Sequence, residues 1–181
     1  TRRMHPERRP PRPLDVAALE RLALRYVERF ATTRGKLASY LTRKVRERGW
    51  EGEPADPVAI AERFAELGYV NDRIYAESKA SAMARRGLGA RRVNDALRHA
   101  GVRERDAEAI ASQVTERTNE TALAFARKRR IGPFAETQAD HDKLAKQVAA
   151  MMRAGHSPDL AWKIARMNPG ECVDPLLETD W

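Results

Sequence analysis

The chain has 181 residues, of which 33% are charged and only 6% are aromatic, so no large aromatic core can form. Lys and Arg outnumber Asp and Glu by 34 to 26, which gives a net charge of +8. Residues 1–13 are strongly basic and residues 169–181 are acidic, so the two ends cancel and the middle carries the whole excess. Such a basic body favours a polyanionic partner or an acidic protein surface. The alternative is a solvated, arginine-rich surface without a partner.

Several classes of protein are excluded by what the chain lacks. The single cysteine, Cys172, cannot form an internal disulfide or a cysteine-rich zinc site. No apolar run approaches the roughly 18 residues that span a bilayer, and the basic start leads into no signal-type segment. We therefore expect a soluble, cytoplasmic protein.

The two ends of the chain are predicted to lie outside the folded part. Residues 1–16 form an arm rich in arginine and proline, which we expect to be flexible. Residues 169–181 form an acidic tail that is interrupted by proline, and we expect it to fray or fold back loosely.

Between the arm and the tail, apolar residues recur at helical spacing, as in Leu37, Leu41 and Val45. No segment alternates as a strand would, so the fold class is all-α, with about nine short helices. Asp56-Pro57 and Ser157-Pro158 have the pattern of a helix N-cap followed by proline in the first turn. Four glycines follow apolar stripes, where a helix C-cap favours glycine: Gly49, Gly68, Gly101 and Gly155.

Three of these glycines close similar helices, in the patterns Leu41-x3-Val45-x3-Gly49-Trp50, Val93-x3-Leu97-x3-Gly101-Val102 and, more weakly, Gln147-x3-Met151-x3-Gly155-His156. The glycines are 52 and 54 residues apart. A period near fifty predicts three tandem three-helix repeats in an elongated array, with bounds at 17–70, 71–117 and 118–168.

The stretch ARRGLGARRV, residues 84–93, places two arginine pairs around Gly87 and Gly89. A dinucleotide-binding loop needs a third glycine where this chain has Arg92, and it follows a strand rather than a helix. A GxxxxGK[ST] phosphate loop is also absent from the sequence. We interpret Gly-Leu-Gly as the C-cap of one helix and a hinge into the next.

Catalytic patterns are missing as well. The histidines are scattered in the sequence, at His5, His99, His141 and His156. Asp140-His141-Asp142 could hold a metal, but a solvated helix start explains it better. We expect no enzymatic activity, no cofactor and no metal.

The central block contains four short motifs: Leu67-Gly68-Tyr69-Val70-Asn71-Asp72, Tyr75-Ala76-Glu77-Ser78, Arg85-Arg86-Gly87-x-Gly89, and Arg92-Val93 with Leu97. Together these motifs resemble the signature of the RecX family of RecA regulators. The similarity extends over about residues 19–168 and is strongest in 64–102.

The resemblance implies three tandem three-helix repeats, in agreement with the period. It also implies a regulatory protein that binds in the groove of the filament of RecA recombinase on single-stranded DNA. Such a protein modulates the filament, usually as an inhibitor, and affects recombination, DNA repair and the SOS response. An elongated monomer suits the family. Two alternatives stay open: a general DNA-binding helical protein that acts by competition for DNA, and a protein-only adaptor.

The binding candidates are two basic clusters, since arginine forks suit phosphate and carboxylate alike. The clusters are Arg85, Arg86, Arg91 and Arg92, and Arg127, Lys128, Arg129 and Arg130. For both, a solvated charged face is the alternative. Structural roles are expected for Gly68, Gly87 and Gly89. Tyr69 is expected to pack between repeats, and Asp72 to cap the helix that follows it.

Overall fold

The computed structural model describes residues 12–178, and the predictions made for residues 1–11 and 179–181 lie outside this part of the chain. The described residues form eleven α-helices, one 3-10 helix and one isolated bridge, which joins Leu14 to Trp50. The predicted all-α class is confirmed, although the helices are more numerous than the nine expected. None of the described helices is both long and apolar enough to cross a membrane.

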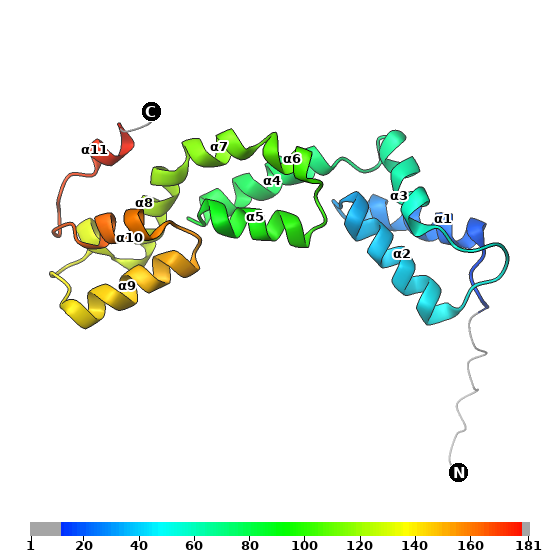
Figure 1. Ribbon diagram of the computed structural model, residues 1–181, viewed down its shortest axis with the longest axis horizontal. Coiled ribbons are helices and arrows are strands. Elements are labelled where there is room, and N and C mark those ends of the chain that lie inside the picture. Colours follow the sequence, from blue (N-terminus) through cyan, green and yellow to red (C-terminus); the bar gives the residue numbers. More distant parts are fainter. Residues whose placement is uncertain (1–11, 179–181) are drawn as a thin grey trace, which may run out of the picture. The chain divides into compact units, whose positions relative to one another are not determined.

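The chain divides into two compact units, Thr1–Asn71 and Asp72–Trp181. The first contains the helices α1 (Val16–Arg29), α2 (Arg34–Arg48) and α3 (Pro57–Glu66) (Figure 1). Each helix begins where a short polar side chain accepts a hydrogen bond from an amide three residues on: Asp15, Thr33 and Asp56. Local sequence therefore determines where these three helices start.

The described part of the predicted arm, residues 12–16, includes a residue that packs on the first unit. Leu14 is 1% exposed, and its backbone pairs with the segment that follows α2. The amide of Leu14 donates to the carbonyl oxygen of Gly49, and its carbonyl oxygen accepts from the amide of Glu51, both at 2.9 Å. Leu14 supplies an apolar side chain to the core of the first unit.

The second unit contains the remaining helices (Figure 1): α4 (Asp72–Arg85), α5 (Ala90–His99), α6 (Glu104–Glu108), α7 (Ala111–Glu116), α8 (Thr118–Arg129), η1 (Gly132–Phe134), α9 (His141–Arg153), α10 (Pro158–Ala165) and α11 (Asp174–Leu177). The break between α6 and α7 lies at Ile110, whose amide bonds to the carbonyl oxygen of Ala107 at 3.2 Å. This tight turn forms without glycine or proline, so the sequence does not reveal it, and the expected number of helices was too low.

The tail also differs from its prediction. Instead of folding back loosely, it forms α11, which packs on α8. Leu176 is 4% exposed, and the side-chain amide of Asn119 donates a hydrogen bond of 2.8 Å to its carbonyl oxygen. Burial of this one leucine accounts for the order of the segment.

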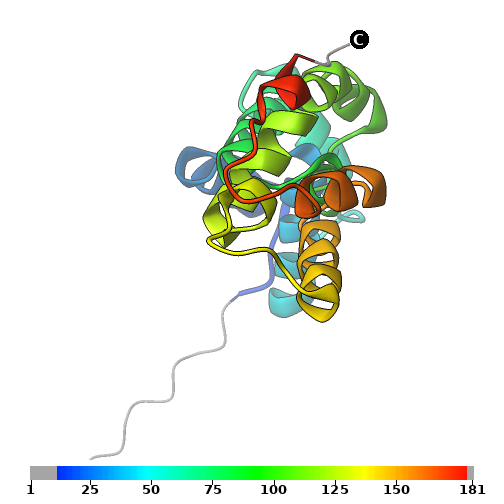
Figure 2. The ribbon, with the colours of Figure 1, turned by 90° about the vertical axis from the view of Figure 1, so that its left-hand side faces the viewer.

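The described residues contain three separate apolar cores. One lies within the first unit, one among α4, α5, α6 and α7, and one among α8, α9, α10 and α11. Figure 2 shows α10 beside α9, two of the helices that form the third core. Three cores are compatible with three repeats, but the repeat bounds and the elongated shape remain predictions.

Candidate functional site

The stretch ARRGLGARRV forms the corner between α4 and α5. The amides of Gly87 and Leu88 donate to carbonyl oxygens in the last turn of α4 at 2.8 and 3.1 Å, which is a Schellman ending. Gly87 has a φ of +77°, which residues with a side chain adopt at a cost. Gly89 then takes the N-cap position of α5. The stretch is thus a tight helix–helix corner.

This corner lies against a second corner, between α9 and α10. The amide of Gly89 donates to the carbonyl oxygen of Ala154 at 2.9 Å, and that of Arg91 to the carbonyl oxygen of Gly155 at 3.3 Å. A Cβ on Gly89 would lie 2.5 Å from the carbonyl carbon and oxygen of Gly155, and one on Gly155 would lie 2.6 Å from the amide nitrogen of Arg92. Glycine permits this close approach of two backbones. We call this contact the glycine junction (Gly87, Gly89, Gly155).

His156 completes the glycine junction. Its ring is 5% exposed, lies 5.8 Å from the ring of Phe125, and places Nε2 2.9 Å from the carbonyl oxygen of Gly87. Burial lowers the pKa of His156, and the hydrogen bond to Gly87 only partly opposes this. We infer the neutral tautomer in which Nε2–H donates to that carbonyl oxygen. Nδ1 is then a buried acceptor with no partner among residues 12–178.

We expect the protein to lose stability in mild acid through His156. Its pKa is below the ordinary value of about 6.5 in the folded state and near that value in the unfolded chain. The unfolded state therefore takes up the proton first, and the free energy of unfolding falls as the pH drops below about 6.5. Chemical denaturation of wild type and His156→Gln between about pH 7 and pH 5 measures this, with a flatter profile expected for the variant.

The matched control is His99→Gln, since His99 is exposed on α5. Equal slopes for His156→Gln and wild type would show that His156 does not titrate against folding.

The structure brings the two predicted basic clusters together. The ammonium of Lys128, in the last turn of α8, donates to the carbonyl oxygen of Arg85 at 3.0 Å. A Cβ on Gly87 would lie 2.7 Å from the amide nitrogen of Phe125, so the α4–α5 corner also packs directly on α8. We call the combined surface the basic corner, and all eight of its side chains are exposed: Arg85, Arg86, Arg91, Arg92, Arg127, Lys128, Arg129 and Arg130.

The two halves of the basic corner are engaged differently. Arg127 and Arg129 lie over aromatic rings, at 4.6 Å from Phe134 and 5.7 Å from Phe125, and Arg130 pairs with Glu136 at 3.0 Å. By contrast, within residues 12–178 no acidic side chain forms an ion pair with the other half, which we call the corner arginines: Arg85, Arg86, Arg91 and Arg92. Their positive potential is left uncompensated by close partners.

Three further signature residues lie at the start of α4 or just before it. Gly68 follows α3 with a φ of +84° and open space around it. Tyr69 is 55% exposed and tilts against the ring of Phe64 at 5.5 Å, and its expected place between repeats remains a prediction. Asp72 is 1% exposed and is the first residue of α4, and its expected role as a cap of this helix remains a prediction. Its carboxylate still lies in the first turn, where the helix dipole favours it.

The other candidates do not form a site. In the described part of the chain, no three His, Cys, Asp or Glu side chains are grouped so that they could hold a metal ion. Asp140 is the N-cap of α9, where its carboxylate accepts from the amide of Lys143 at 2.8 Å. His141 and Cys172 are exposed.

The sequence patterns did not predict the glycine junction, although one residue in the repeat pattern pointed to it. The other two closing glycines of the repeat pattern are followed by Trp50 and Val102, whereas Gly155 is followed by His156. A polar residue at an otherwise apolar repeat position points to a special contact there.

Similar proteins are known. No family model matches the chain. The regulatory protein RecX of Myxococcus xanthus is 34% identical over 177 residues, which cover 90% of this chain and 93% of the relative. The regulatory protein RecX of Agrobacterium fabrum is 29% identical over 160 residues, which cover 85% of each chain. Both relatives are named as regulatory proteins.

The fold has a counterpart among solved structures. The crystal structure of RecX from Lactobacillus salivarius matches with a TM-score of 0.63, over 82% of this chain and 92% of that chain. The two sequences are 22% identical, so the match concerns the fold alone.

Proposed function

The chain belongs to the RecX family of regulatory proteins, and we propose that it binds the filament of RecA recombinase on single-stranded DNA. There it inhibits ATP hydrolysis and strand exchange, and so acts on recombination, DNA repair and the SOS response. We propose further that it works in the cytoplasm, as a monomer and without chemistry of its own.

The observation that supports this proposal most is the basic corner. It gathers eight cationic side chains from three helix ends, and the corner arginines have no acidic partner among the described residues. Arginine forks bind phosphate and carboxylate oxygens in a bidentate manner. A filament presents both groups, on its DNA and on its protein.

Local stability does not explain the placement of the two corner arginines on α5. Arg91 and Arg92 lie in the first turn of α5, where the helix dipole disfavours cations. Arg127 and Arg129 lie in the last turn of α8, where the dipole favours them. The corner arginines on α5 are therefore better explained by a bound anion than by the helix that carries them.

The alternative is a general DNA-binding protein that acts on the recombinase by competition for DNA. The same arginines favour it, because they suit phosphates as well as carboxylates. The low aromatic content of 6% argues against it, since single strands are commonly held by stacking of bases on aromatic rings.

A binding titration separates the two functions. Labelled single-stranded DNA, naked or coated with the cognate recombinase, is titrated with the protein at one salt concentration, because phosphate contacts weaken steeply with salt. A filament regulator binds coated DNA more tightly. Equal or tighter binding to naked DNA would contradict the proposal and favour the competitor.

A further inference from the structure

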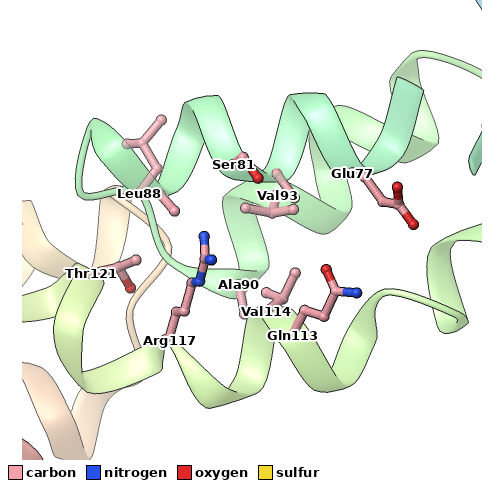
Figure 3. Close-up of a pocket in the computed structure, with 11 residues that line it drawn as sticks. Glu77, Ser81, Leu88, Ala90, Val93, Gln113, Val114, Arg117 and Thr121 are labelled. Carbon is pink, nitrogen blue, oxygen red and sulfur yellow. The ribbon is translucent and has the colours of Figure 1, made fainter. Parts of the chain in front are cut away.

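A narrow slot opens on the second unit, between α4 on one side and α7 and α8 on the other (Figure 3). Its walls are small or aliphatic side chains from α4, α5, α7 and the α4–α5 corner: Ser81, Ala84, Leu88, Ala90, Val93 and Val114. All except Val93 are half-buried, so solvent reaches these apolar walls.

The two ends of the slot differ in charge. Arg117, between α7 and α8, directs its guanidinium into the slot near Leu88 (Figure 3). This guanidinium forms no hydrogen bond or ion pair within residues 12–178. Glu77 lies at the opposite end and is paired with Arg73 at 3.1 Å. One end therefore offers an uncompensated cation, and the other a carboxylate that is already neutralised.

The cationic end continues into the basic corner. Leu88 stands in the chain between Arg86 and Arg91, so an occupant that leaves the slot past Leu88 meets the corner arginines. Apolar walls with cations at one end suit an apolar anchor that is followed by acidic residues.

We propose that this slot binds one aliphatic side chain of an acidic peptide segment on a protein partner. A neighbouring carboxylate of that segment pairs with Arg117, and further acidic residues lie on the basic corner. The inference rests on the proposed function, since the recombinase in the filament supplies the segment. It adds a contact to protein, distinct from any contact to DNA.

The lining of the slot argues for a side chain rather than a nucleobase. No aromatic residue lines it, whereas extruded bases are held by stacking on aromatic rings.

The test fills the slot or removes its charge in the full chain. Ser81→Leu places a larger side chain in the slot and retains good helix propensity for α4. Its control, Ser78→Leu, makes the same change at an exposed position of α4 that does not line the slot. Arg117→Met removes the cation, and Arg105→Met, on the exposed surface of α6, is the matched control.

Binding of each variant to recombinase-coated and to naked single-stranded DNA is measured at the same salt. Loss of one buried anchor commonly costs enough free energy to weaken binding about tenfold. We expect that loss for Ser81→Leu and Arg117→Met on coated DNA, with binding to naked DNA unchanged. The two control variants should bind as wild type on both.

The outcomes separate the two proposals. If the wild-type protein binds coated DNA no more tightly than naked DNA, this result contradicts both the proposed function and the slot proposal. Wild type with a preference for coated DNA, and unchanged binding by both slot variants, overturns the slot proposal alone. An equal loss of binding to naked and coated DNA by the slot variants would mean that the slot contacts DNA. This result would also overturn the slot proposal. If circular dichroism shows that Ser81→Leu does not fold, Arg117→Met decides, because its side chain is exposed.

Discussion

Replacing Arg85, Arg86, Arg91 and Arg92 together with alanine is expected to weaken binding to recombinase-coated DNA by about 30-fold or more. Exposed ion pairs contribute about 0.5 kcal/mol or more each, and four of them reach about 2 kcal/mol. Fluorescence anisotropy on labelled coated DNA measures the change. The free energy of unfolding should stay constant or rise slightly, because Arg91 and Arg92 oppose the dipole of α5.

The control for this variant removes the same total charge elsewhere. Arg21, Arg25, Arg29 and Arg46 are exposed in the first unit, and their replacement by alanine lowers the net charge equally. We expect a much smaller loss of binding for this control. Equal losses would mean that only net charge matters and that the basic corner has no special role.

The second large effect concerns the glycine junction and stability. Gly89→Ala introduces a Cβ at 2.5 Å from the backbone of Gly155 and at 2.7 Å from Nδ1 of His156. Gly89 has a φ of −79°, so the backbone itself tolerates alanine and the cost comes from the contact alone. Crowding of this kind costs about 1–3 kcal/mol, and we expect the upper part of that range because backbone atoms must move. Urea denaturation followed by circular dichroism measures it.

Gly170→Ala is the comparison, because Gly170 has a φ of +78° but no atom within 4 Å of the added Cβ. It isolates the cost of the backbone conformation, about 1–2 kcal/mol. Gly155→Ala combines both penalties and should be the least stable of the three. If Gly89→Ala unfolds at the same urea concentration as wild type, the two corners do not approach as closely as described.

Local patterns in the sequence predicted much of the fold. Asp56-Pro57 and Ser157-Pro158 begin α3 and α10 as expected, since a cap and its helix lie within a few residues of each other. The break at Ile110 and the burial of Leu176 were not predictable in this way. The burial of Leu176 depends on packing partners that are distant in the sequence. The break at Ile110 is a turn without glycine or proline.

The candidate site was predictable in its residues but not in its arrangement. The two arginine-rich clusters stand out in the sequence, and 35 residues separate Arg92 from Arg127. Their meeting depends on the bond from Lys128 to Arg85 and on the packing of Gly87 against Phe125, which no local pattern reveals. The slot beside Arg117 draws on four segments and could not be found from any one of them.

The most direct test of the central claim is the comparison of recombinase-coated and naked single-stranded DNA, run together with ATP hydrolysis by the recombinase. The protein is added well below one molecule per recombinase monomer. Tighter binding to coated DNA, together with a strong fall in hydrolysis, is the result that we predict. Equal or tighter binding to naked DNA, with hydrolysis unchanged until the protein saturates the DNA, would contradict a regulator of the filament.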